Sequence, residues 1–262
     1  MQDVVVQAPR ASARTVLWEQ VRTITGRSVT NDPLPHFQAP ICIGAIGLPG
    51  DIARVVLDRM IAIAEETGIE PAGNPCEPNV VVIFADGGRA ELKRLATKRR
   101  SAFASLSHAE LRRLLDAPGP AQAWNLTEVR SRDGDPLMPG EKTGDPPRLR
   151  IGSASRIASS IRHDMVAAAV VIERTALIGK SPQQIAAYAA MRTFVRSTPP
   201  ANAPAETILS LFDDGSAPPT DLTAFDRAIL RGVYKGRPND FARTRQAEMV
   251  SLAMAGKVKA EN

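Results

Sequence analysis

The feature that most constrains the fold is an alanine-rich segment, residues 181–196, which follows a run of apolar residues at 166–172. The segment opens with Ser181, a proline and two glutamines. A serine hydroxyl can accept a hydrogen bond from an amide of the first helical turn, and a glutamine three residues after the serine can complete a capping box. Proline fits the first helical position. Residues 185–191 carry no charge, and small side chains let a helix lie close to a sheet. The segment therefore predicts a buried central helix packed on a buried strand.

Around these two elements, apolar periodicity and turn residues predict an α+β fold. Strands are expected at residues 4–6, 41–46, 79–85, 121–130 and 166–172, and helices at 12–25, 51–67, 89–99, 107–115, 221–234 and 240–255. The unbroken apolar run at 79–85 is typical of a strand buried on both faces. Strands and helices do not alternate throughout, which argues against a doubly wound sheet and favours a mixed sheet. We divide the chain into an N-terminal arm (residues 1–36), an α+β domain (37–238) and a C-terminal helix and tail (239–262).

Positive charge is concentrated in one part of the chain. The whole chain has a formal net charge of +5, whereas residues 89–113 alone contain eight lysines and arginines against two glutamates, an excess of six. We favour a solvated helix face; the alternative is a binding surface for nucleic acid, anionic lipid or an acidic protein. Nucleic-acid surfaces usually interleave aromatic side chains, and this segment offers only Phe103. The candidate anion-binding residues are Lys93, Arg94, Lys98, Arg99 and Arg100.

The two cysteines, Cys42 and Cys76, each lie beside glycine or proline residues that indicate loops. A single pair that flanks a predicted helix in this way favours a disulfide over two buried thiols. The first nine residues lack the charged and apolar regions of a signal peptide, so the chain is either cytosolic or a mature secreted domain numbered after signal removal. The cysteine pair favours the second alternative, a periplasmic or secreted protein. No apolar run reaches the roughly 20 residues of a membrane span.

Two stretches near the C-terminal end carry a resemblance. Residues 206–211 read Glu-Thr-Ile-Leu-Ser-Leu, and a following segment contains Leu222, Thr223, Asp226, Val233 and Tyr234. This tail resembles that of the zincin metalloproteases, in which a metal-binding helix is followed by a tight turn under the site and by a closing helix of this form, with leucine in place of the valine. The chain is also similar to uncharacterised secreted proteins of alphaproteobacteria, through its cysteine frame and its alanine-rich helix. The resemblance covers roughly residues 37–235. It implies a zincin-like mixed sheet with a buried central helix and a C-terminal helical segment.

The zinc-binding motif of that family is missing. A zincin helix carries two histidines at positions i and i+4, which hold zinc, and a glutamate between them as general base. The corresponding positions here are Gln184 and Tyr188, which are poor zinc ligands, and Ile185 stands where the glutamate would be. Leu209 lies near the position at which the family's turn carries methionine. The resemblance therefore implies a vestigial cleft formed by Gln184, Tyr188 and Leu209, in which Tyr188 donates its hydroxyl to a buried acceptor in place of a metal.

Other catalytic patterns are weak. The chain has three histidines, and they lie far apart in the sequence, which disfavours a zinc site with three histidine ligands. His163 and Asp164, together with Glu173, form a candidate acid/base group, for which we favour a capped strand entry with solvated charges. We therefore expect no catalytic residue, no metal and no cofactor.

These observations favour a non-catalytic exported protein, a pseudoenzyme on a degenerate zincin-like scaffold, which binds a protein or peptide partner. One alternative is a hydrolase or peptidase with an unrecognised active site. The other is an anion- or nucleic-acid-binding protein that uses residues 89–113, with nucleic acid the less favoured partner.

Overall fold

The computed structural model describes residues 12–27, 30–140, 144–152, 156–201, 206–213 and 217–260, with side chains as far as residue 256. The strand expected at residues 4–6 lies outside this part. The centre of the molecule is a mixed five-stranded sheet composed of β1 (His36–Phe37), β2 (Ile43–Ile46), β3 (Val80–Ala85), β4 (Ala121–Ser131) and β5 (Ile161–Glu173). The pairs β1–β5, β3–β5 and β2–β3 are parallel, and β4 pairs with β5 in the antiparallel direction. The predicted α+β class with a mixed sheet is therefore confirmed.

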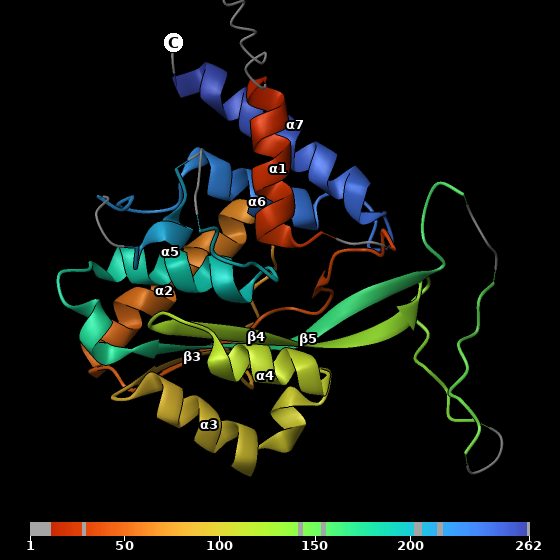
Figure 1. The fold of residues 1–262 in the computed structure, drawn as a ribbon, viewed down its shortest axis with the longest axis horizontal. Coiled ribbons are helices and arrows are strands. Elements are labelled where there is room, and N and C mark those ends of the chain that lie inside the picture. Colours follow the sequence, from red (N-terminus) through yellow and green to blue (C-terminus); the bar gives the residue numbers. More distant parts are fainter. Residues whose placement is uncertain are drawn as a thin grey trace, which may run out of the picture.

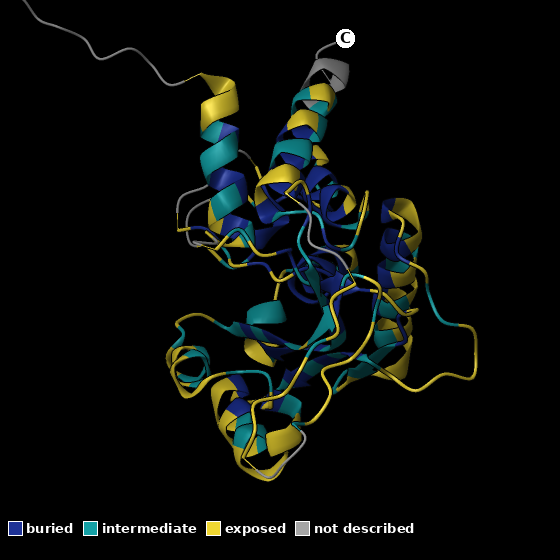
Figure 2. Ribbon diagram, turned by 90° about the vertical axis from the view of Figure 1, so that its right-hand side faces the viewer, coloured by how far each residue is buried: buried dark blue, intermediate teal, exposed yellow. Residues whose placement is uncertain are grey.

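Helices cover both faces of the sheet (Figure 1). One face carries α2 (Gly50–Thr67) and α5 (Pro182–Thr193), and the other carries α3 (Gly88–Lys98) and α4 (His108–Asp116). The helices α1 (Ala13–Thr25), α6 (Ala224–Tyr234) and α7 (Ala242–Ala260) lie beyond α5, farther from the sheet. Three short 3₁₀ helices, η1 (Arg100–Phe103), η2 (Arg174–Leu177) and η3 (Ile208–Ser210), complete the described elements. In Figure 2 the buried residues gather in the middle of the molecule, and the outer surfaces of the helices are exposed.

The central helix α5 has the properties expected of it. Ser181 and Gln184 form a complete capping box, and a proline stands at the first helical position. Every residue from Ile185 to Thr193 is buried. The small alanine side chains let this helix sit between the sheet, α2 and the η3 turn. The prediction of a buried central helix is confirmed.

The strand β3 is less uniformly buried than its apolar run predicts. Val80, Val82 and Phe84 are buried in the large core under α2 and α5. Ile83 and Ala85 belong to a smaller cluster under α3 and α4 and are half-buried, because those two helices cover the sheet only in part. The expectation of full burial on both faces is wrong for this second face.

The strand β5 begins at Ile161, five residues before the predicted start. Its first residues include Arg162, His163 and Asp164, so they lack the apolar run that marks the rest of the strand. Backbone pairing with β4, which runs from Ile161 to Ile172, and with β1 holds this polar part in the sheet. The strand β1 was also missed, because its two residues are too few to show any periodicity.

The N-terminal and C-terminal helices pack against each other. Gln246 on α7 donates hydrogen bonds to Thr25 Oγ1 and to the Gly26 carbonyl at the end of α1, both at 3.0 Å. Buried side chains of both helices, such as Ile24 and Met249, join the same core as the sheet and α5. The division into arm, domain and tail stays a prediction.

Cys42 and Cys76 form a disulfide, with their Cα atoms 6.0 Å apart. The bridge links the residue before β2 to the loop that leads into β3, as predicted. Cys42 is buried and Cys76 is exposed. In the described part of the chain, no helix has the length and apolar character needed to cross a membrane.

Candidate functional site

A cleft of about 470 Å³ lies beside the outer edge of β4. Its walls are the strand residues 121–123, the side chains of Tyr188 and Arg192 on α5, and the turn that carries Leu209 and Phe212. Most of the lining is apolar, and it includes the prolines at 118, 120, 199 and 200. We refer to this cavity as the cleft.

The backbone of β4 leaves its outer edge open at the cleft. The Pro120 carbonyl accepts a hydrogen bond from Glu173 N, which fixes the pairing with β5. Since backbone groups alternate in direction along a strand, residues 122 and 124 bond to β5, whereas the N–H and C=O groups of Ala121 and Ala123 point outward. Within the described part of the chain these outward groups have no hydrogen-bond partner.

The same edge is closed farther along the strand. Ser105 Oγ donates to the Asn125 carbonyl at 3.3 Å and accepts from Thr127 N at 3.2 Å. A hydroxyl from the segment between η1 and α4 thus occupies the place that another strand would take. The open part of the edge is therefore short, and it coincides with the cleft.

The turn beneath the cleft is held by a buried carboxylate. Asp226 Oδ2 accepts from Ile208 N and from the backbone N and hydroxyl of Thr223, each at 2.9 Å, and Oδ1 accepts from Thr207 Oγ1 at 2.5 Å. Burial raises the pKa of Asp226, and these donors oppose the rise. Through these bonds α6 fixes the turn that carries Leu209.

Tyr188 is buried in the cleft wall, and its ring packs edge-on against Phe212 with 4.8 Å between the ring centroids. Burial raises the pKa of its hydroxyl. This hydroxyl makes no hydrogen bond to a residue that the structure describes. The expectation that it donates to a buried acceptor is therefore wrong, because ring packing holds Tyr188 in place instead.

The structure brings together two of the three residues of the expected cleft. Tyr188 and Leu209 line it, whereas Gln184 does not. Gln184 caps α5 and donates its Nε2 to the Pro219 carbonyl at 2.8 Å. Its side chain is used to fasten the start of α5.

Arg192 is the cleft residue that sequence analysis missed. It follows Tyr188 by four residues, so both side chains lie on one face of α5, and it is the charged residue of an otherwise uncharged buried face. Its Cζ atom lies 6.0 Å from the centroid of the Tyr188 ring. The spacing from Tyr188 was the signal that could have found it.

The cleft offers the parts of a binding site. Besides Tyr188 and Arg192, the described residues that line it contribute the exposed Asp213, the Thr198 hydroxyl and apolar side chains. Free backbone groups beside an apolar pocket with one cationic group are suited to hold an extended peptide. Nowhere in the described ranges do three His, Cys, Asp or Glu side chains cluster as metal ligands.

The candidate acid/base group of His163, Asp164 and Glu173 is not assembled. Asp164 forms ion pairs with Arg162 at 3.0 Å and with Arg130 at 3.5 Å. Glu173 accepts hydrogen bonds from the backbone of residues 87 and 88 at the start of α3. Because a strand rises about 3.3 Å per residue, Glu173 lies about 30 Å from His163. His163 lines a separate cavity of about 500 Å³, and burial lowers its pKa.

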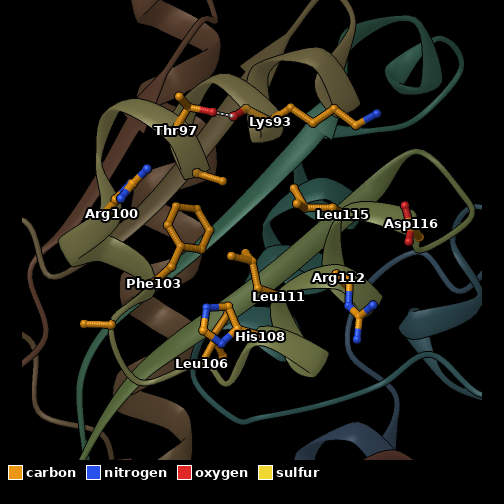
Figure 3. Close-up of a pocket in the computed structure, with 12 residues that line it drawn as sticks. Lys93, Thr97, Arg100, Phe103, Leu106, His108, Leu111, Arg112, Leu115 and Asp116 are labelled. Carbon is orange, nitrogen blue, oxygen red and sulfur yellow. Dashed lines mark hydrogen bonds between the residues drawn. The ribbon is translucent and has the colours of Figure 1, made fainter.

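The basic segment forms a third cavity, of about 750 Å³, between α3, η1 and α4. Figure 3 shows apolar side chains, among them Phe103, Leu111 and Leu115, in its interior, with Lys93, Arg100 and Arg112 around them. We call this cavity the basic groove. The helices α3 and α4 cover the face of the sheet opposite α5, and the basic groove has no lining residue in common with the cleft.

Both glutamates of the basic segment are already engaged. Glu91 pairs with Arg94, and Glu110 is bonded to Ser107 and Arg196. In the part of the chain that the structure describes, five basic side chains form neither an ion pair nor a side-chain hydrogen bond: Lys93, Lys98, Arg99, Arg100 and Arg112. Arg89 and Arg113 donate to the backbone carbonyls of Ala117 and Ala109 instead of to a carboxylate. Of the candidate anion-binding residues, Arg94 is thus the one that is neutralised within its own helix.

Comparisons of the chain with protein-family models, with curated proteins and with solved structures found no match.

Proposed function

We propose that the protein is a non-catalytic exported protein that binds an extended segment of a partner protein along the outer edge of β4. The observation that carries the proposal is the pair of free backbone positions, Ala121 and Ala123, which open into the apolar cleft. A peptide that adds to a sheet edge gains affinity from backbone hydrogen bonds and specificity from pockets for alternate side chains. The disulfide between Cys42 and Cys76 supports an oxidising compartment, such as the periplasm or the exterior of the cell.

The zincin-like scaffold is part of this proposal. Its support is the order of α5, the η3 turn packed on α5, and α6, whose Asp226 holds that turn. In the zincins this order belongs to the metal-binding helix, the turn under the site and the closing helix. Of the two positions that correspond to the zinc ligands, Tyr188 lines the cleft beside Arg192, whereas Gln184 caps α5.

Blocking the edge tests the proposal. Ala123→Pro removes an N–H that points away from β5, so the ladder of β4 with β5 keeps its hydrogen bonds, and proline is tolerated on such an edge. Ala123→Ser keeps the N–H and serves as the matched control. We expect a degenerate peptide pool to bind the wild type and the serine variant, and to bind the proline variant at least tenfold more weakly.

Hydrogen exchange gives an independent readout of the same edge. The amides of Ala121 and Ala123 are expected to exchange rapidly in the free protein and slowly with bound peptide. Binding that leaves both amides unprotected, or that is equal in the proline and serine variants, would contradict the proposal. Chelator-sensitive hydrolysis of casein would contradict its non-catalytic part and favour the alternative of a peptidase.

A second candidate function uses the basic groove. Unpaired cations around the apolar Phe103, Leu111 and Leu115 fit an acidic segment with apolar side chains of a partner protein. Charge reversal at Lys93 and Arg100 should abolish capture of an acidic peptide, whereas Arg54→Glu on α2 should not. Preferential binding of a DNA duplex with a steep salt dependence would indicate nucleic acid instead.

A further inference from the structure

The cleft contains a buried charge without a partner. The Arg192 side chain belongs to a residue only 7% exposed, and its Nε and Nη1 atoms are covered and make no hydrogen bond. Its Nη2 atom makes no hydrogen bond to a described residue either, but it is not among the fully covered atoms. The guanidinium group therefore presents Nη2 to the cleft that Arg192 lines.

Burying an unpaired guanidinium group is unfavourable, and such a group in a native structure calls for an explanation. The Tyr188 ring lies at 6.0 Å from Cζ, at the outer limit of a cation–π contact. Asp213 lines the same cleft, but it is exposed and forms no ion pair with Arg192. The described protein groups therefore leave the charge of Arg192 without a counter-ion.

We propose that Arg192 binds a carboxylate group of the peptide segment that pairs with β4. The Nη2 atom is the part of the guanidinium group that is not covered, and its hydrogens can donate charge-assisted hydrogen bonds to a carboxylate that enters the cleft. Ala123 and Arg192 line one cavity, and alternate side chains of an extended segment on the β4 edge point to one face. The inference rests on the proposed function and adds the chemistry that selects the partner.

The experiment compares three degenerate hexapeptide pools with the full-length, disulfide-bonded protein. The first has a central aspartate and an amidated C-terminus, the second a central asparagine and an amidated C-terminus, and the third a central asparagine and a free C-terminal carboxylate. All other positions are equal mixtures of Ala, Val, Leu, Ser and Thr. Affinities are measured by fluorescence anisotropy for the wild type, Arg192→Met and Arg196→Met.

We expect the aspartate pool or the free-carboxylate pool to bind the wild type at least tenfold more tightly than the neutral pool. The pool that gains identifies the source of the carboxylate as a side chain or a chain end. This preference should vanish in Arg192→Met and persist in Arg196→Met, because Arg196 is exposed and already paired with Glu110. Equal binding of all three pools to the wild type, or a preference that survives in Arg192→Met, would overturn the assignment but leave peptide binding intact. Failure of every pool to bind would refute both proposals together.

Thermal unfolding without peptide tests the premise that the charge is unpaired. Methionine has a similar length and no charge, so Arg192→Met should leave the Tm of the free protein unchanged or raise it. A Tm several degrees below that of the wild type would show that Arg192 has an internal partner, and it would overturn the proposal whatever the peptide pools do.

Discussion

Replacing Asp226 by alanine tests the most heavily bonded side chain near the cleft. The change removes a carboxylate that accepts four hydrogen bonds. Two of the donors, the Ile208 amide and the Thr207 hydroxyl, belong to buried residues and lose this acceptor. Each unsatisfied buried donor costs about 1–3 kcal/mol. The broken capping box at Thr223 costs about 1 kcal/mol more. Part of this loss is offset because a buried carboxylate is removed, so we expect the free energy of unfolding to fall by about 3–4 kcal/mol.

Asparagine at the same position is the matched control. Its carbonyl can take the place of Oδ2, where three of the four donors meet, and its amide can donate to the Thr207 hydroxyl. We expect Asp226→Asn to cost about 1 kcal/mol. Urea unfolding at pH 7 measures both variants, with the m-value as a check on two-state behaviour. An alanine variant within 1 kcal/mol of the wild type, or an asparagine variant as unstable as the alanine one, would refute the reasoning.

The pH dependence of the Asp226 effect has a definite sign. Burial raises the pKa of Asp226, so the folded protein holds this proton more tightly than the unfolded chain does. The resulting stability is fully present below the unfolded carboxyl pKa of about 3.9 and is lost as the pH rises through the folded pKa. Since asparagine does not titrate, the advantage of the wild type over Asp226→Asn should shrink as the pH is raised. An advantage that grows toward neutral pH would contradict this sign.

Three further changes have defined outcomes. Tyr234→Phe should cost about 1–2 kcal/mol in urea unfolding, because the Tyr234 hydroxyl donates to the Phe194 carbonyl at 2.6 Å at the end of α5; an unchanged midpoint would contradict that role. Exchanging Cys42 and Cys76 together for serine should cost about 3–4 kcal/mol, from the entropy of a loop closed over 34 residues, and thiol titration of the denatured, unreduced wild type should find no free thiol. Burial lowers the pKa of His36, so the stability that it contributes is present above the unfolded pKa of about 6.5 and is lost as the pH falls. The fall in stability between pH 7.5 and 5.5 should therefore be smaller in His36→Gln, and an identical fall in both proteins would exclude His36 as its cause.

The elements of the fold were largely predictable because they carry local signals. Capping boxes at Ser181 and Ser107 mark two helices, and the structure shows both boxes complete. Gly68 ends α2 in the left-handed conformation, which glycine adopts readily and which commonly terminates helices. The apolar runs at 79–85 and 166–172 mark the two inner strands. The polar first residues of β5 and the short strand β1 were not predicted, because only their pairing with other strands holds them in the sheet.

The cleft was predictable only in part, because it depends on contacts between distant segments. Tyr188 and Leu209 were expected there from the resemblance, and both line it. The direction of the Gln184 side chain depends on the Pro219 carbonyl, which lies 35 residues away in the chain. The open edge at Ala121 and Ala123 follows from the register of β4 against β5, which no local pattern encodes. The spacing of Arg192 from Tyr188 places it on the same face of α5, but the lack of a partner for its buried guanidinium group depends on the surrounding tertiary contacts.

The pairing of β5 also determines when the sheet can form during synthesis. Among the described strands, β5 has three neighbours: β4 on one side, and β1 and β3 on the other. The strand β5 ends at Glu173. Until that residue has emerged, the six apolar residues of β3 keep one edge unpaired, and β4 has no partner at all. An unpaired apolar strand edge is a template for association with other chains. A nascent chain that contains β3 and β4 but has not yet reached Glu173 therefore exposes such an edge, and it is the form that a chaperone would have to shield.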